Sequence, residues 1–374
     1  MKTLSSYNFR DKRVLLRTDL NSDVVNKKVL MSERIKRASE TISELKKKKA
    51  KVVIIAHQGR PKDRYFTSLK QHSRLLSKFT KVKFVNDIIG KKALKEIKNL
   101  KPGQALLLEN IRFLKDEFNF NGKQNRLIKN LVPLFDIYVN DAFSVCHRKH
   151  TSIVGFPKYL MNCAGRLLEK EVKSLKKINL KNCLYVLGGA KPEENMKLLK
   201  GKKSLACGLF GQLCLISKGK NLGAQNKYLK DKLYLISKLK KRLKGVQTPV
   251  DFAVKIRSRR KELSLEEFPS KYEIYDIGEK TMKNFIEEIQ KANSIYMKGP
   301  VGFCADGKFC NGTFTILKAI AKNKGHSIIG GGHLSDAVKK SRIKLGKFDN
   351  VSLSGGALLR YIAGEKLPGL EALR

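Results

Sequence analysis

The sequence has few cysteines, no long apolar run and few acidic residues, and these deficits exclude several classes of protein. Its 7 cysteines are an odd number, and no Cys-x-x-Cys pair or Cys/His cluster has the spacing of a zinc site. No apolar stretch approaches the roughly 18 residues that a transmembrane helix needs. Residues 1–10 also lack the apolar centre of a secretory signal. We therefore expect a cytoplasmic protein with buried free thiols at Cys207 and Cys214, and no metal at Cys304 and Cys310.

The shortage of acidic residues leaves a formal net charge of +46, from 79 Lys and Arg against 33 Asp and Glu. Such a charge suits either a nucleic-acid or membrane partner, or lysines that fill solvated helix faces. The basic residues are scattered, and aromatic residues do not interleave with them as a stacking platform requires. We favour solvated faces, with no specific nucleic-acid partner, no membrane partner and non-specific polyanion binding at low salt.

Two phosphate-binding signatures are also missing. The chain has no Gly-x-x-x-x-Gly-Lys-Ser/Thr, which excludes a P-loop enzyme. It has no Gly-x-Gly-x-x-Gly at the start of a βαβ unit, which argues against dinucleotide binding.

Short β-rich runs alternate with longer lysine-rich helical stretches along the 374 residues. This pattern predicts an α/β protein with two doubly wound parallel-sheet (Rossmann-like) domains joined by a helical hinge. The domains are expected at residues 1–158 and 177–353, with the interdomain helix within 159–176. Strands are expected near residues 14–17, 52–56, 83–85, 105–108, 137–139, 183–187, 203–206, 251–254, 273–275, 294–297, 327–329 and 350–353. Helices are expected near residues 32–48, 69–79, 124–131, 164–175, 333–340 and 358–362.

Charged and polar side chains follow the apolar runs of the first half. These residues are Asp19, Asn21, His57, Arg60, Arg112 and Arg148. Open α/β sheets bind ligands at the carboxyl ends of their strands, so these side chains should converge. Arg34 lies in the first turn of the expected helix 32–48, where backbone N–H groups also favour an anion. The first half therefore predicts a site for a small anion.

Glycines follow the apolar runs of the second half. Gly188-Gly189-Ala190-Lys191 ends one run, while Gly330-Gly331-Gly332 and Gly355-Gly356 open expected helices. Glycine lets backbone N–H groups approach a phosphate, and a lysine adds a mobile positive charge. An anion site in one half and a phosphate cradle in the other predict a two-substrate phosphoryl transferase.

With both sets of residues in view, the chain resembles the phosphoglycerate kinase family over essentially its whole length, and most of all its archaeal branch. The matching motifs are His57-Gln-Gly-Arg-Pro61, Leu108-Glu-Asn-Ile-Arg-Phe113, Tyr138-Val-Asn-Asp-Ala-Phe143, His147-Arg148, Leu187-Gly-Gly-Ala-Lys191, Gly299-Pro-Val-Gly302, Gly330-Gly-Gly332 and Leu367-Pro-Gly-Leu-Glu-Ala-Leu373. The resemblance implies the glycolytic and gluconeogenic reaction, a reversible phosphoryl transfer between 1,3-bisphosphoglycerate with ADP and 3-phosphoglycerate with ATP. Catalysis would rest on positioning and charge stabilisation in a closing cleft, with Mg²⁺ accompanying the nucleotide.

The resemblance also implies site residues. It assigns 3-phosphoglycerate to Asp19, Asn21, Arg34, His57, Arg60, Arg112 and Arg148. It assigns the nucleotide to Gly188, Gly189, Lys191, Gly208, Gly299, Pro300, Gly330, Gly331, Gly332 and His333. Arg34, Lys191, Gly355 and Gly356 are expected to stabilise the transferred phosphoryl group. The tail 354–374 would complete the 3-phosphoglycerate domain 1–158, and residues 177–353 would bind the nucleotide.

The departures from the family pattern all lie on the nucleotide side. Asn195 stands where the family usually has a lysine, which archaeal members often lack, and Lys298 stands where the family has an asparagine. The other departures are Ala305 for a ribose-contacting glutamate, Leu334 for a threonine, and Leu353 with Ser354 in a turn that loses a hydroxyl and a glycine. A catalytically weakened relative that still binds 3-phosphoglycerate therefore stays open, as does a polyanion-binding protein on the same scaffold. The sequence assigns no metal ligand and no nucleotide preference, and it does not separate a monomer from a homodimer.

Overall fold

The computed structural model describes residues 1–199, 201–304 and 307–373, and it divides into two compact units. Unit 1 comprises Met1–Val172 with Gly364–Arg374, and unit 2 comprises Lys173–Ala363. Each unit is built on a six-stranded sheet, which confirms the predicted pair of parallel-sheet α/β domains. Ala305, one of the departures noted in the sequence, lies outside the described residues. The domain boundaries expected from the sequence stay a prediction.

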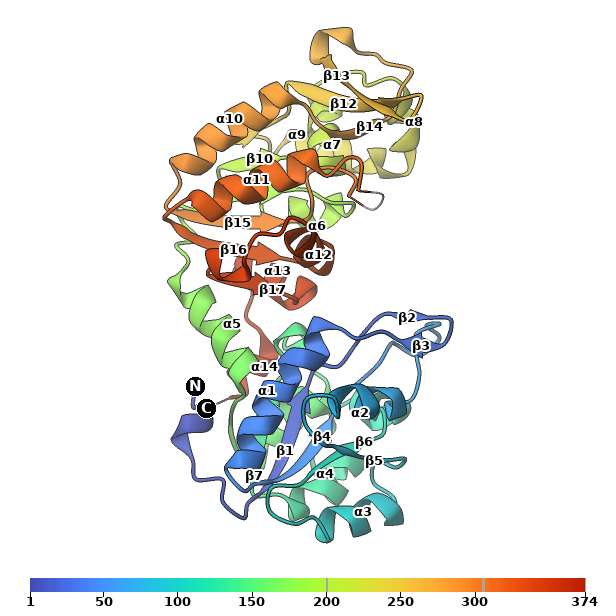
Figure 1. Ribbon diagram of the computed structural model, residues 1–374, viewed down its shortest axis with the longest axis vertical. Coiled ribbons are helices and arrows are strands. Elements are labelled where there is room, and N and C mark those ends of the chain that lie inside the picture. The colour runs from blue at the N-terminus through green and yellow to red at the C-terminus, as the bar shows by residue number, and fades with distance from the viewer. Residues whose placement is uncertain (200, 305–306, 374) are drawn as a thin grey trace. The chain divides into compact units, whose positions relative to one another are not determined.

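The sheet of unit 1 has the strand order β5-β6-β4-β1-β7-β8 (Figure 1). Its strands are β1 (Arg13–Thr18), β4 (Lys51–Ile55), β5 (Lys83–Val85), β6 (Ala105–Leu108), β7 (Ile137–Asp141) and β8 (Met161–Ala164). The expected strands are confirmed, and β8 is an addition that the sequence did not indicate. All pairings within this sheet are parallel. The carboxyl ends of the neighbouring strands β6, β4, β1 and β7 therefore share one edge.

Helix α1 (Glu33–Lys47) illustrates how the local sequence builds unit 1. The Ser32 side chain caps it by accepting from the backbone N–H of Ile35 at 3.4 Å, as a serine N-cap does. Ile35, Ala38 and Ile42 recur at helical spacing and are buried in one core cluster with residues of β1 and β4. The other helices of this unit are α2 (Lys70–Leu76), α3 (Lys91–Lys98), α4 (Arg126–Leu131) and α14 (Pro368–Glu371), and a hairpin joins β2 (Val24–Val25) to β3 (Lys28–Val29).

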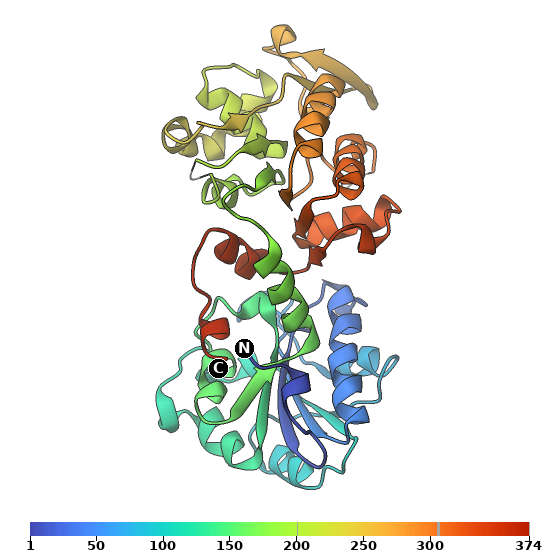
Figure 2. The ribbon, with the colours of Figure 1, turned by 90° about the vertical axis from the view of Figure 1, so that its left-hand side faces the viewer.

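The C-terminal segment belongs to unit 1, and Figure 2 shows it returning there after α13 (Gly355–Ile362). The backbone N–H of Gly369 donates to the carbonyl of Cys146 at 2.8 Å. A Cβ at position 369 would lie 2.7 Å from the Ile153 side chain, so a glycine is required for this approach. The structure thus places residues from Gly364 onward in unit 1, while α13 belongs to unit 2.

Unit 2 contains a second parallel sheet, with the order β11-β10-β9-β15-β16-β17. Its strands are β9 (Leu184–Leu187), β10 (Ser204–Ala206), β11 (Val246–Gln247), β15 (Ser294–Lys298), β16 (His326–Gly330) and β17 (Asn350–Ser352). Helices α10 (Glu279–Gln290), α11 (Asn311–Lys322) and α12 (Gly332–Lys340) share one core cluster with β9, β15 and β16. The remaining helices are α6 (Pro192–Met196), α7 (Gly208–Ser217), α8 (Ala224–Tyr228) and α9 (Ile236–Lys240).

A small antiparallel sheet extends unit 2, with the order β13-β12-β14. Its strands are β12 (Asp251–Ile256), β13 (Arg259–Ser264) and β14 (Ile274–Ile277). The strands expected at 251–254 and 273–275 are present, but they pair here and not in the parallel sheet. The turn between β12 and β13 holds Arg257 and Ser258 at φ 43° and 65°. Positive φ at both turn residues is the geometry of a tight hairpin, although neither residue is the usual Asn or Gly.

Helix α5 (Arg166–Lys177) matches the helix expected at 164–175, and the chain passes from unit 1 into unit 2 within it. Its first residue, Arg166, pairs with Glu44 at 2.6 Å and with Glu169 at 2.7 Å. Within the described ranges, no helix is long and apolar enough to cross a membrane.

Candidate active site

The predicted anion-binding residues of unit 1 lie around one edge of its sheet. Asp19 follows β1, His57 follows β4, Arg112 follows β6, and Arg148 lies beyond the end of β7. Burial lowers the pKa of His57 most, and the guanidinium groups of Arg17, Arg112, Arg34 and Arg148 lower it further. Arg60, an exposed residue, lowers the pKa of Arg112. We call Arg17, Arg34, His57, Arg60, Arg112 and Arg148 the basic cluster.

Arg17 was not singled out by the sequence analysis, yet it organises this cluster. It is fully buried at the end of β1, and its Nε donates to Ser152 Oγ at 2.9 Å. One of its terminal nitrogens lies 3.0 Å from His57 Nδ1. Because a guanidinium can only donate, Nδ1 must accept, and the proton of the neutral imidazole then resides on Nε2. Arg17 therefore orients the His57 ring so that its N–H donor, Nε2–H, lies on the side of the ring away from Arg17.

Asp19 holds Arg34 within the basic cluster. The Asp19 carboxylate is 2% exposed and pairs with Arg34 and with the Ser144 hydroxyl. Burial opposes ionisation of Asp19, but Arg34 and these hydrogen bonds outweigh it and lower the pKa. Asn21 is engaged nearby, since its Oδ1 accepts from the backbone N–H of Gly59 at 2.8 Å. Asp19 and Asn21 thus already serve to hold the loops that carry the cations.

Arg112 differs from Arg17, the other buried arginine described, because its hydrogen bonding is incomplete. Its side chain bonds the carbonyl of Gly59, and the residue is 4% exposed. Its Nε and one terminal nitrogen lack any partner among the residues that the structure describes. Burial, with Arg17 and Arg148 next in importance, lowers the pKa of Arg112 to about 9. A buried cation with unused donors, beside three other arginines and the one carboxylate of Glu117, is unfavourable unless a further anion binds there.

The glycines of unit 2 fall into two groups, of which the first is tightly packed. Gly188 donates its N–H to the carbonyl of Lys298 at 2.8 Å, and Gly189 donates to that of Pro300 at 2.7 Å. A Cβ at Gly188 would lie 2.3 Å from Pro300 O, and one at Gly299 would lie 2.6 Å from Gly188 O. Gly208 is similarly close to Gly189. These glycines let the loops after β9, β10 and β15 touch through their backbones.

The second group of glycines faces open space. No described atom lies within 4 Å of a Cβ built at Gly331, Gly332 or Gly355. Gly332 and Gly355 are the first residues of α12 and α13, so the unpaired N–H groups of both helices lie here. His333 is exposed beside Gly332, whereas Leu334 is buried in the core. These positions leave room for a group to approach the backbone.

Two lysines share one carboxylate beside the packed glycines. Lys191 Nζ lies 3.7 Å from Glu194, and Lys298 Nζ lies 3.0 Å from the other oxygen of Glu194. Lys298 also donates to Asn195 Oδ1 at 3.0 Å. Asn195 in turn donates to the carbonyl of Gly188 at 2.9 Å. The departures at positions 195 and 298 are therefore direct neighbours in space.

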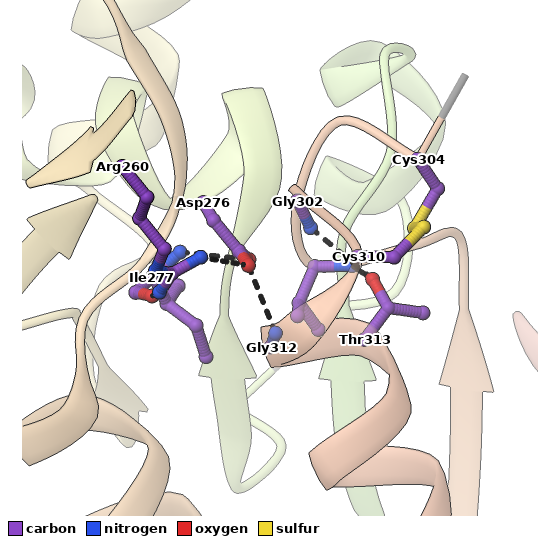
Figure 3. The surroundings of a disulfide bond; sticks show 9 residues. Arg260, Asp276, Ile277, Gly302, Cys304, Cys310, Gly312 and Thr313 are labelled. Carbon is purple, nitrogen blue, oxygen red and sulfur yellow. Dashed lines mark hydrogen bonds and ion pairs between the residues drawn. A yellow bond between two sulfur atoms is a disulfide. The ribbon is translucent and has the colours of Figure 1, made fainter. Parts of the chain in front are cut away.

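A disulfide joins Cys304 to Cys310 in the loop after β15, and the sequence analysis did not anticipate this pairing (Figure 3). The chain around it is anchored, since Thr313 Oγ1 accepts from the backbone of Val301 at 3.1 Å. The buried Asp276 accepts from Gly312 N–H at 2.8 Å and pairs with Arg260 at 2.7 Å. Burial raises the pKa of Asp276 to about 6. Cys207 and Cys214 are free and buried, as expected.

Several features of the site were missed because they depend on tertiary contacts. These features are contacts between residues far apart in the chain, namely Arg17 with Ser152, Asp19 with Ser144 and Lys298 with Asn195. A signal existed for Arg17, which is a charged residue inside an apolar strand. In the described residues, no group of three or more His, Cys, Asp or Glu side chains is placed to hold a metal ion.

Comparison with known proteins identifies the family. The family model described as phosphoglycerate kinase matches residues 4–365. The chain is 40% identical to a phosphoglycerate kinase of Sulfolobus acidocaldarius, with 99% of this chain and 95% of the relative covered. It is 36% identical to one of Methanopyrus kandleri, with 100% and 97% covered. The crystal structure of phosphoglycerate kinase from Pyrococcus horikoshii OT3 superposes with a TM-score of 0.92 at 35% identity, covering 100% of this chain and 98% of that one. The chain belongs to the phosphoglycerate kinase family.

Proposed function

We propose that this chain catalyses the phosphoglycerate kinase reaction, in which a phosphoryl group moves reversibly between ATP and the carboxylate of 3-phosphoglycerate. Family membership over residues 4–365 supports this proposal. The observation that carries it within the chain is the incomplete hydrogen bonding of the buried Arg112 among like charges. A phosphate or carboxylate would supply the acceptors that this guanidinium lacks.

The basic cluster is the proposed site for 3-phosphoglycerate. Arg112, Arg60 and Arg148 offer guanidinium forks to phosphate oxygens, and His57 offers its Nε2–H. Asp19 and Asn21 hold Arg34 and the Gly59 loop in place, and they are proposed to bind the substrate hydroxyl as well. Arg34 is the proposed group that stabilises the transferred phosphoryl.

The glycine corners of unit 2 are the proposed site for the nucleotide. The packed set, Gly188, Gly189, Gly208, Gly299 and Pro300, shapes the loops, and so does Gly330, which ends β16 against the Leu358 side chain. Gly331 turns the chain into α12, while Gly332 with His333 and Gly355 with Gly356 present helix N–H groups to phosphates. Lys191 is 73% exposed at its side chain and is free to follow the transferred group. Mg²⁺ would enter as part of the nucleotide substrate, because this ion commonly binds phosphates with one or two protein carboxylates at most.

The reaction needs no protein nucleophile, because the substrate carboxylate is itself the acceptor. The protein has to hold donor and acceptor in line and to neutralise charge on the transferred group. Arg34, Lys191 and the N–H groups at Gly355 and Gly356 are suited to that neutralisation. The acid–base groups of the basic cluster are not required to move a proton.

The first test is turnover with 3-phosphoglycerate and MgATP in a coupled assay, compared between the wild type, Arg34→Ala and Arg34→Lys. We expect Arg34→Ala to lower kcat by roughly 100-fold or more, the size of effect seen when a preorganised donor to a transition state is removed. Arg34→Lys keeps the charge opposite the buried Asp19 but loses the planar fork. Its kcat should fall between the other two.

Stability must be measured alongside, since Arg34→Ala leaves the Asp19 carboxylate without its main partner. Arg34→Lys is the control for that effect, and both variants should be compared by urea unfolding. If Arg34→Ala turned over the substrates as fast as the wild type, the proposed role of Arg34 would be contradicted. A wild type without turnover on these substrates would contradict the proposed function itself.

A further inference from the structure

Lys298 ends the strand that lies centrally among the glycine corners of unit 2. It is the last residue of β15, where its backbone pairs in register with Leu187 of β9 on one side and Gly330 of β16 on the other. The loops after these two strands begin at Gly188 and Gly331. Since the strands are parallel, Lys298 lies between two of the proposed phosphate-binding loops.

The ammonium of Lys298 is held by the loop that carries Lys191. Its partners in the described structure are Asn195 Oδ1 and Glu194, each at 3.0 Å. An ammonium has three N–H donors, so these two contacts leave one donor for a further acceptor. Lys298 is 12% exposed at its side chain and Glu194 is 35% exposed, so the carboxylate is the more accessible member of the pair.

Glu194 connects Lys298 to Lys191, since its two oxygens lie 3.0 Å and 3.7 Å from their ammonium groups. A carboxylate between two lysines occupies a position that suits a phosphate equally well, because both are anions with several acceptor oxygens. Burial lowers the pKa of Lys298, and Glu194 opposes this effect. The buried ammonium is therefore favoured by an anion beside it.

We propose that Lys298 is a nucleotide-phosphate-binding residue of this enzyme, and that a lysine at the neighbouring position 195 could supply the same positive charge. The contact between Lys298 and Asn195 carries this inference, which rests on the proposed function. A lysine placed at position 195 would bring its ammonium close to the place that the Lys298 ammonium now occupies. An asparagine at position 298 could then accept a hydrogen bond from that lysine, as Asn195 now accepts one from Lys298. Exchanging the two residues would then keep one positive charge at the nucleotide site.

The test compares Lys298→Met with the exchange variant Lys298→Asn/Asn195→Lys. Steady-state kinetics would give KM and kcat separately for MgATP and 3-phosphoglycerate. Lys298→Met should raise KM for MgATP by about 10- to 100-fold, the factor for a lost hydrogen bond to a charged group, and leave KM for 3-phosphoglycerate unchanged. The exchange variant should recover most of this loss, because the charge returns from the neighbouring position.

Lys202→Met is the matched control. Lys202 is also a half-buried lysine of unit 2, bonded to the carbonyl of Leu180, but it precedes β10 at the opposite edge of the sheet. Its loss should leave both KM values unchanged. An unchanged KM for MgATP in Lys298→Met would overturn the proposal. So would an exchange variant that regains the melting temperature but not the KM, because Lys298 would then be a structural residue.

Binding of MgADP, measured by calorimetry without turnover, separates this inference from the proposed function. If the wild type turns over no substrate but Lys298→Met still weakens MgADP binding and the exchange restores it, the role of Lys298 stands while the proposed reaction fails. If Lys298→Met does not fold, the exchange variant alone decides. MgADP binding near wild type then supports the proposal, and binding weakened by 10-fold or more overturns it.

Discussion

Two buried arginines in unit 1 show how a single residue type serves different purposes. Arg17 is fully buried and bonds Ser152, the carbonyl of Thr18 and His57. Arg112 bonds the carbonyl of Gly59, and its other buried donors have no partner in the part of the chain that the structure describes. Satisfied buried charges hold a structure together, whereas unsatisfied ones oppose folding. Arg112 is therefore retained at a site where it opposes the stability of the ligand-free protein.

Replacing Arg112 by methionine should separate binding from stability. We expect the free energy of unfolding of ligand-free Arg112→Met to stay the same or to rise by up to roughly 1–4 kcal/mol, as when buried charges are replaced by apolar residues of similar volume. Addition of 3-phosphoglycerate should raise the melting temperature of the wild type but not of the variant. Urea unfolding and thermal melts with and without ligand provide both measurements.

Arg17→Met is the control for this prediction, because it removes a guanidinium whose hydrogen bonds are made. Its free energy of unfolding should fall, since Ser152, His57 and the Thr18 carbonyl would lose a buried partner. A ligand-free Arg112→Met that is as unstable as Arg17→Met would show that Arg112 is structural.

The sequence predicts the cations of the basic cluster because they follow apolar runs, but not which of them are satisfied. Asp19 and Asn21 look available for hydroxyl groups in the sequence. In the structure, both already bind protein groups, namely Arg34 with Ser144 and the Gly59 backbone. Hydrogen-bond satisfaction depends on which loops meet, and a pattern along the chain carries no such information.

At the scale of elements, the glycines separate into those that pack and those that leave space. Gly188 and Gly299 are required where two loops touch through their backbones. Gly332 and Gly355 stand at helix starts with no described atom within 4 Å of a Cβ built there. The double-glycine pattern is the same in both groups, so the sequence alone predicted phosphate approach for all of them.

Gly355→Ala should therefore weaken nucleotide binding without unfolding unit 2. A methyl group at this position meets open space, and alanine is a better helix former than glycine. It would nevertheless keep a phosphate from the N–H groups at the start of α13, and each lost hydrogen bond to a charged group corresponds to about 10-fold or more in affinity. Calorimetry with MgADP and a thermal melt provide the two measurements.

Gly346→Ala is the matched control, since Gly346 is also exposed and open but lies in the turn before β17, at the amino end of the strand. It should change neither quantity. Equal MgADP affinity in Gly355→Ala and the wild type would exclude the start of α13 from the nucleotide site.

The composition of the individual strands explains which parts of the fold could be predicted from the sequence. The short apolar runs within β1, β4, β9 and β15 are buried and identify parallel strands by composition alone. Strand β13, by contrast, begins with alternating exposed and half-buried positions and carries Arg259, Arg260 and Lys261. Its hairpin with β12 lacks the usual turn residues, so the antiparallel sheet was not predicted.

At the scale of the whole molecule, the net charge of +46 includes lysines that lie on solvated helix faces. Helix α3 is representative, because Ala93 and Ile97 are buried while Lys91, Lys95 and Lys98 are exposed. Lysines on such faces raise solubility and attract anions in general. This arrangement predicts binding to any polyanion through charge, without recognition of sequence.

Two DNA duplexes of unrelated sequence should consequently bind with equal affinity at low salt, as measured by fluorescence anisotropy. Raising the salt from about 50 mM to about 200 mM should weaken both by about 10³-fold or more, because binding through many phosphate contacts depends on counterion release. Arg34→Ala should leave this binding nearly unchanged, since it removes one charge of many, while it lowers turnover. A preference for one duplex, or affinity that persists in salt, would instead indicate a built nucleic-acid site. If Arg34→Ala lowers turnover but leaves DNA binding unchanged, the two properties have separate origins. DNA binding would then come from the surface charge, and turnover from the residues at the carboxyl ends of the strands in each sheet.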